Sequence, residues 1–388
     1  MRAHGVGTPR VPAGDQASAP RGPRRRGVVA PTGPLSADAL VALQRTAGNR
    51  AARQAVRRQP SPTTAHPVVQ RAPYGLDLPT SRTAYVDQAA QLYRSKKDLP
   101  LEDFVKAVMT TIAGELKAAG VPLFAWTLVT DAGAAGSFDS ETWKVKINTA
   151  SFTSGDTPPR VLGDLDPQEV TEVVGTLYHE SRHADQDVVV LRSLLAQKQT
   201  PAQIHATTKI PVAVVEAVRA TTYAKPLDAD QVAHAERMFD VMYGKHKELL
   251  TLLMQHSDAF TGLDTLAQPG SVLADGAPHV AVFTTWQTDV LRPKLTAMAA
   301  AKRPTTTEKT LRERLQAIDT AIARLSAAWT KVTRAKRPVA SDTSAVRTQA
   351  GKLRDAVLAA YRGLEGEADA FRVEAQVKAA FATKLAKR

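Results

Sequence analysis

The stretch LDPQEVTEVVGTLYHESRHADQDVVVLRSLLAQ, residues 165–197, carries the clearest structural pattern in the chain. Asp166, Pro167 and Glu169 are typical of a helix start, because Asp caps the first turn, Pro fits the first helical position and Glu completes a capping box. Apolar residues then recur on one helical face, at Val170, Val173, Val174 and Leu177. We therefore expect a long helix whose apolar stripe packs against a core.

Two histidines stand four residues apart inside this predicted helix. His179 and His183 lie one turn apart on the same face, so both imidazoles can bind one Zn²⁺ from the same side. Glu180 is rotated by about 100° from His179, which lets its carboxylate reach a water on the metal without binding the metal. This is the arrangement of the H-E-x-x-H motif. It predicts a zinc site with Glu180 as catalytic base; the alternative is an ordinary helix that happens to carry two histidines.

Zinc catalysis needs three protein ligands and one open position. The chain has no cysteine, so the third ligand is expected to be His, Asp or Glu. The best source is YRGLEGEADAFRVEAQV, residues 361–377, a predicted helix that contains Glu365, Glu367, Asp369 and Glu374. Glu236, which is nearer in sequence, is a rival ligand. Spacing alone does not choose among these carboxylates, and an acidic solvated face is the competing interpretation.

LYHESRHADQ, preceded by AGSFDSETWKVKIN and followed by YRGLEGEADAF, resembles bacterial zincin-like metallopeptidase domains of the glutamate-zincin kind. The resemblance covers about Trp126 to Glu374. It implies a strand at the edge of a substrate cleft and a third ligand that is a Glu followed by Ala-Asp on a later helix. On that match Glu367 is the metal ligand, with Glu365 and Glu236 as alternative ligands. The helices of about residues 200–340 are expected to form an insertion.

Further roles follow from the chemistry that such a site needs. A second carboxylate should orient a histidine N–H, and Asp369 is our candidate. A group must stabilise the oxyanion, and Tyr178, Tyr223, Tyr243 and the arginine residues are candidates. The strand predicted by the alternation of Trp143, Val145 and Ile147 is expected to receive an extended peptide by strand addition.

The composition indicates a soluble globular body preceded by a basic region. Of 388 residues, 43% are hydrophobic and only 5% aromatic, which favours a helical core. Residues 1–72 hold 12 Arg, no Lys and 2 Asp, a net +10 of the whole-chain +13. This region has no aromatic residue before Tyr74 for base stacking, and the rest of the chain is nearly neutral, so nucleic-acid binding is disfavoured.

We expect residues 1–73 to be disordered except for a short helix at 35–57 that serves docking or export. The segment LQRTAGNRAARQAV, residues 43–56, resembles one found near the N-terminus of bacterial proteins associated with extracellular contractile injection systems and polymorphic toxins. That resemblance implies an injection-apparatus or secretion partner. The first 20 residues lack the apolar region of a cleaved signal peptide, and no run of about 18 apolar residues predicts a membrane span. We therefore expect synthesis in the cytoplasm and export by a non-classical or contractile injection route.

The predicted fold is α+β and predominantly α, with residues 74–388 forming a zincin-like domain that contains a small antiparallel sheet. The predicted function is zinc-dependent hydrolysis of peptide bonds by a secreted or injected effector or toxin. The alternative is a non-catalytic zincin-fold binding or cargo module of an injection system. Glu180 favours the enzyme, because a module without activity has no need for a general base.

Overall fold

The computed structural model describes residues 74–130, 135–152, 159–222, 226–244, 276–335 and 339–387, and also the four positions 259, 262, 263 and 266. The predicted N-terminal region, 1–73, with its short helix at 35–57, lies outside the described residues. The described part is predominantly helical with one small sheet, which confirms the α+β class with most of the structure in helices. None of its helices is long and apolar enough to cross a membrane.

The helix predicted around the two histidines is present as α4, Pro167–Ala196. It begins as predicted: Asp166 Oδ1 accepts hydrogen bonds from the backbone N–H groups of Gln168 (2.8 Å) and Glu169 (2.7 Å), and Glu169 Oε2 accepts one from the Asp166 N–H at 3.0 Å. Every apolar side chain of the predicted stripe is fully buried. A capped start and a buried stripe together explain why so long a helix forms here.

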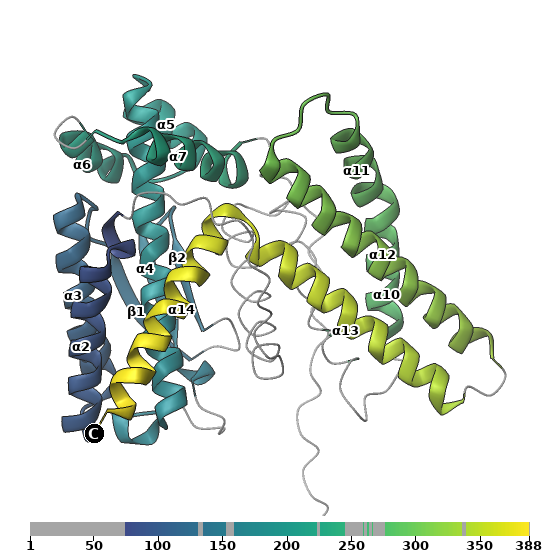
Figure 1. The fold of residues 1–388 in the computed structure, drawn as a ribbon, viewed down its shortest axis with the longest axis horizontal. Coiled ribbons are helices and arrows are strands. Elements are labelled where there is room, and N and C mark those ends of the chain that lie inside the picture. Colours follow the sequence, from purple (N-terminus) through teal and green to yellow (C-terminus); the bar gives the residue numbers. More distant parts are fainter. Residues whose placement is uncertain are drawn as a thin grey trace, which may run out of the picture. The chain divides into compact units, whose positions relative to one another are not determined.

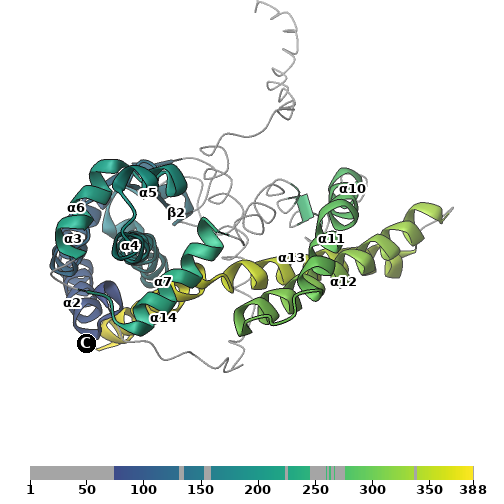
Figure 2. The same ribbon diagram turned by 90° about the horizontal axis from the view of Figure 1, so that it is seen from above.

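Helix α4 lies in the middle of the larger apolar core, and other elements pack around it (Figure 2). The helices of this core are α2 (Pro79–Ser95), α3 (Leu101–Ala119), α5 (Pro201–Thr208), α6 (Val212–Thr222), α7 (Ala229–Met242) and α14 (Glu365–Ala386). Short 3₁₀ turns are η1 (Gly75–Asp77), η2 (Thr149–Ser151) and η3 (Leu162–Asp164). Helix α3 ends at Gly120, whose φ of 83° is the left-handed conformation of a C-terminal cap. Because α4 is buried on nearly all sides, its polar residues need partners from these neighbours.

The sheet has three strands in the order β1 (Ala125–Val129), β3 (Lys144–Asn148), β2 (Gly136–Asp139). β2 pairs with β3 antiparallel, but β1 pairs with β3 in parallel. The prediction of an antiparallel sheet is therefore wrong for one of the two pairings. The alternation of apolar residues reveals which residues share a face, but it carries no information on the direction of the neighbouring strand.

Trp143 does not belong to the strand, contrary to its place in the predicted alternation. It has a φ of 52°, in the left-handed region that bulky residues rarely adopt, and β3 begins at the next residue. Its ring is buried and its indole Nε1 donates a hydrogen bond to the Pro122 carbonyl at 3.1 Å. Burial of the ring explains why a non-glycine residue holds this conformation.

A second apolar cluster is built from helices between α7 and α14 in the sequence. It contains α10 (Ala277–Trp286), the π-helical turn η5 (Gln287–Leu291), α11 (Arg292–Ala299), α12 (Thr306–Arg334) and α13 (Ala340–Arg362). Helices α12 and α13 lie side by side (Figure 1) and bury a common apolar seam that includes Leu315, Ile318 and Leu353. The described part of the predicted insertion is thus helical.

Candidate metal centre

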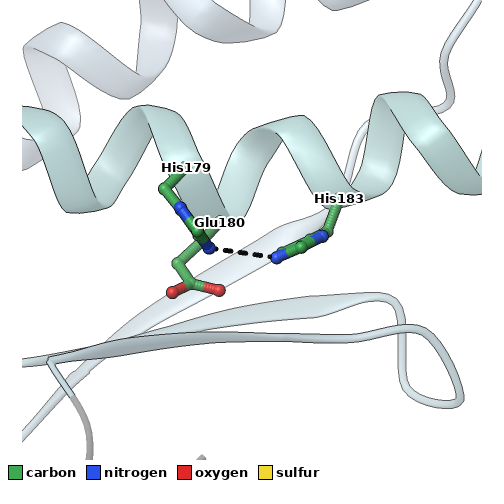
Figure 3. A group of neighbouring side chains, drawn as sticks. All are labelled: His179, Glu180 and His183. Atoms are coloured by element: carbon green, nitrogen blue, oxygen red, sulfur yellow. Dashed lines mark hydrogen bonds between the residues drawn. The ribbon is translucent and has the colours of Figure 1, made fainter. Parts of the chain in front are cut away.

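His179 and His183 project from the same side of α4, and Glu180 lies beside them (Figure 3). Their Nε2 atoms are 3.2 Å apart. Ligand atoms of His179, Glu180 and His183 all lie within 4.8 Å of one another, so these three side chains alone could surround a cation. Helical geometry produces this cluster without help from the rest of the fold, because i and i+4 side chains meet on one face.

The carboxylate of Glu367, on α14, meets both histidines. Its Oε2 is 3.6 Å from His179 Nε2 and its Oε1 is 3.7 Å from His183 Nε2. Two zinc ligands with bonds of about 2.0–2.2 Å at a tetrahedral angle lie roughly 3.3–3.6 Å apart. The two distances from Glu367 to the histidines are close to that separation. Oε2 is buried without a hydrogen-bond partner among the described residues, and such an atom is what a bound cation satisfies. The residues present therefore fit a metal held by two imidazoles and one carboxylate.

The Glu180 carboxyl is held by a strand of the sheet, whereas the Glu367 carboxylate meets the two histidines. Glu180 is 3% exposed and accepts a hydrogen bond from the backbone N–H of Phe138, on β2. Burial raises its pKa to about 7; His179 and the Phe138 N–H act against the rise, whereas Glu367 and Glu374 add to it. Because this carboxyl is held by the sheet and titrates near neutrality, it suits proton transfer better than metal ligation.

Gly136 lets β2 approach α4 closely enough for that contact. A Cβ at this position would lie 2.7 Å from Thr176 Cγ2 and 2.8 Å from Glu180 Cγ, both shorter than real contacts allow. Any larger residue must push β2 away from the helix. The glycine in AGSFD is thus explained by the close approach of a strand to the metal helix.

Glu374, two turns beyond Glu367 on α14, orients the first histidine. Its Oε2 lies 2.8 Å from His179 Nδ1, and its Oε1 lies 2.5 Å from Lys378 Nζ. Burial on its own raises the pKa of Glu374, but Lys378 and His179 outweigh it and hold the pKa well below its usual value. A carboxylate on Nδ1 leaves Nε2 facing the metal position, as in metal-bound histidines generally.

The second histidine is oriented by an amide. Gln186 Oε1 lies 2.9 Å from His183 Nδ1, and Gln186 Nε2 donates to Asp369 Oδ2 at 2.8 Å and to the Gly366 carbonyl at 2.9 Å. Asp369 also accepts from Arg182 Nε at 2.9 Å. The expectation that Asp369 orients a histidine directly is wrong: Asp369 binds Gln186 and Arg182, and Gln186 contacts the imidazole.

The two alternative third ligands are placed elsewhere. Glu365 accepts hydrogen bonds from His234 and Arg237 on α7, and Glu236 is an exposed side chain of α7. On a helix, Glu365 and Glu367 are rotated by about 200° from one another, so the two cannot face α4 together. Of these three carboxylates in the described part of the chain, Glu367 is the one that contacts the two histidines.

Two of the three tyrosines predicted as oxyanion donors are bonded elsewhere. The Tyr178 hydroxyl donates to the Leu76 carbonyl at 2.6 Å, and the Tyr243 hydroxyl donates to Asp187 Oδ1 at 3.1 Å. Tyr223 lies outside the described residues. A different tyrosine, Tyr361 at the end of α13, hydrogen bonds to Glu367, and burial with the nearby charges of Glu367 and Glu180 raises its pKa well above the usual value. The phenol therefore contacts Glu367, and its hydroxyl lies within range of the charge on Glu180.

Sequence reasoning missed Glu374 as a histidine partner, and it missed Gln186 and Tyr361. One signal was present for Glu374: residues 367, 371 and 374 share a helical face, and the Phe371 ring lies 4.6 Å from the His179 ring. Gln186 is three residues beyond His183, again one turn along. Tyr361 stands six residues before Glu367, but the junction between α13 and α14 interrupts the helical spacing, so no helical pattern indicated this contact.

Asp187, one turn beyond His183, is a buried carboxyl whose Oδ1 accepts a hydrogen bond from the Tyr243 hydroxyl. Burial raises its pKa from 3.8 to about 7, so the folded state binds the extra proton between about pH 4 and 7. The unfolding free energy should fall as pH rises through that window. Asp187→Asn is expected to be more stable than the wild type at pH 8, by up to about 4 kcal/mol, and to lose the advantage near pH 4.

Denaturant unfolding at several pH values, with chelator present for all proteins, measures this difference. Asp98→Asn, at an exposed position, is the matched control and should follow the wild type at every pH. An Asp187→Asn protein that is less stable than the wild type at pH 8 contradicts the expectation.

Comparisons of this chain with protein-family models, curated proteins and solved structures found no match. The geometry of the site is therefore the basis for the function proposed below.

Proposed function

We propose that this protein is a zinc-dependent metallopeptidase of the zincin kind. One observation carries the proposal. The Nε2 atoms of two imidazoles on α4 and the carboxylate of Glu367 on α14 lie 3.2–3.7 Å from one another, and the buried carboxyl of Glu180 is beside them. Three ligands plus a neighbouring acid–base group is the arrangement of a catalytic zinc site rather than a closed structural one.

His179, His183 and Glu367 are the residues that would hold the metal. Imidazole and carboxylate ligands without cysteine suit zinc among the abundant divalent ions, although they also accept other transition metals. When bound, zinc lowers the pKa of water and polarises a carbonyl oxygen. The outer contacts support this set, because Glu374 and Gln186 each fix the ring orientation of one histidine.

Glu180 is the proposed general base. Its carboxylate takes a proton from the attacking water and then gives it to the leaving amine, so the residue ends the cycle in its starting state. Burial raises the pKa of this carboxyl in the metal-free protein, which helps it to hold the proton between the two transfers. The Phe138 N–H fixes the carboxylate against β2, so that it does not have to be ordered during the reaction.

Tyr361 is the proposed donor for the charge that develops on the substrate oxygen. Its hydroxyl is bonded to Glu367 and lies close enough to Glu180 for that charge to raise its pKa. A phenol that stays protonated can donate its single O–H to an oxyanion when that O–H turns from Glu367 to the substrate oxygen. This assignment replaces Tyr178, Tyr223 and Tyr243.

The substrate is a peptide in extended form, and β2 is the strand expected to align it. Strand β3, the earlier candidate, is the central strand and is paired with β1 on one side and β2 on the other. β2 lies at an edge of the described sheet and carries Phe138, the residue that binds Glu180. Strand addition at β2 would bring the peptide to the base.

The alternative, a binding or cargo module without activity, has less support. Such a module needs no acid–base group, yet Glu180 is buried, fixed by the sheet and next to the metal position. The proposals of an effector or toxin role and of an injection-apparatus partner rest on residues 43–56, which lie outside the described residues.

Removal and return of metal test the proposal. Protein purified without chelator is expected to carry about one zinc per chain and to cleave an unfolded protein such as casein into peptides identified by mass spectrometry. Chelation should abolish cleavage, and stoichiometric zinc should restore it. A protein that binds zinc with all three ligands intact but cleaves no peptide in a broad library would favour the binding module.

A further inference from the structure

The first turn of α14 carries two acidic residues that point in opposite directions. Glu367 faces α4 and its histidines, whereas Glu365 faces α7. Three donors converge on Glu365 Oε1: His234 Nδ1 at 2.8 Å, and Arg237 Nε and Nη2 at 3.2 Å each. His234 is fully buried, so its side of this contact is shielded from water.

This first turn has no side-chain cap. Residue Leu364 stands at the N-cap of α14 and offers no side-chain hydrogen bond, as at the starts of α2, α3 and α13, whereas α4, α5, α7 and α12 begin with a capping box. The first N–H groups of a helix have no intrahelical partner, so an uncapped end frays. Glu367 is the third residue of α14 and therefore lies within the part that frays first.

We infer that His234 and Arg237 of α7 are positioning residues for the third metal ligand, because they fix Glu365 and with it the turn that presents Glu367. The inference rests on the proposed metal site. It ties the metal affinity to α7, a helix of the predicted insertion.

The expected size of the effect follows from the other contacts of α14. Gln186 already ties the Gly366 carbonyl and Asp369 to α4. The helix should stay docked without the Glu365 contacts, and only the placement of the Glu367 carboxylate should suffer. We expect a partial loss of metal affinity, about 10- to 100-fold, as for other residues that support a ligand.

The test compares zinc affinities, measured by competition with a chromophoric chelator, for Glu365→Gln, Arg237→Ala and the wild type. Glu236→Ala, the exposed neighbour on α7, is the matched control and should bind zinc like the wild type. Arg237→Lys keeps a charged donor and should recover part of the affinity lost in Arg237→Ala. Visible absorption of Co²⁺ bound in place of zinc should change in Glu365→Gln, because it reports the ligand arrangement rather than overall stability.

The outcomes separate this inference from the proposed function. Unchanged zinc affinity and Co²⁺ spectra in Glu365→Gln and Arg237→Ala overturn it, even if the wild type is an active peptidase. Weaker affinity that only follows a drop in metal-free melting temperature, with no spectral change, also overturns it. Weaker affinity with a changed spectrum and partial rescue by lysine supports it, whether or not the wild type cleaves peptides.

Discussion

Glu180→Gln is expected to reduce kcat for peptide hydrolysis by about 10²- to 10⁴-fold while zinc stays bound. The amide has the shape of the carboxyl group but cannot take the proton of the attacking water. It can still meet the Phe138 N–H through its oxygen, so the strand and helix should keep their places. The measurements are the initial rate on the best-cleaved peptide and the zinc content of the same sample.

One control variant and one variant of a second proposed group accompany this test. Glu236→Gln makes the same chemical change at an exposed site of α7 and should keep full activity. Tyr361→Phe removes one hydroxyl and should lower kcat more than it changes KM if the phenol donates to the oxyanion. If Glu180→Gln loses its zinc, then Glu180 is itself a ligand, as its nearness to both histidines also allows. If it keeps zinc and full activity, the base is another group.

His183→Ala and Glu367→Ala are each expected to lose the bound zinc. The drop in zinc affinity should exceed the loss of about 10- to 100-fold that follows from changing a residue that only supports a ligand. Each change removes one of three protein ligands from a site whose remaining atoms cannot move closer, because α4 and α14 are both buried in the core. Metal analysis of protein purified without chelator, followed by a competition titration, measures the loss.

Comparison of the carboxylates identifies the third ligand. Glu367→Ala should lose zinc, Glu236→Ala should keep it, and Glu365→Gln should fall between them because Glu365 only holds the turn. Zinc kept in Glu367→Ala but lost in His183→Ala would move the third ligand to another acid, and Glu374 would then be the first to examine because it already contacts His179.

The local features of α4 could be predicted from the chain because they depend on residues close in sequence. The capping box at Asp166, the buried valine stripe and the pairing of His179 with His183 each arise within one or two helical turns. Such patterns hold wherever the helix is placed, since helical geometry alone brings i and i+4 together. The resemblance to zincin domains proposed Glu367, and residue spacing alone left Glu365 and Glu236 equally open.

The sheet was predicted less completely. The alternation of Val145 and Ile147 correctly indicated a strand with one buried face, because side-chain direction in a strand has a period of two. The parallel pairing of β1 with β3 was missed, and so was the left-handed turn at Trp143. Both depend on where the preceding segment of chain lies, and that information is not local.

The sequence by itself therefore determined helix α4 and the placing of two histidines and Glu180 on it. Only the tertiary structure decided which acids meet them. Glu367 and Glu365 are two residues apart, and the rotation of α14 against α4 and α7 sends one to the histidines and the other to His234. The same packing brings Glu374 to His179 and Tyr361 to Glu367. The contacts of Glu367 and Glu374 with the histidines join residues far apart in the chain, whereas Tyr361 and Glu367 are six residues apart, across the junction between α13 and α14. The burial of whole helices, rather than any local pattern, sets these distances.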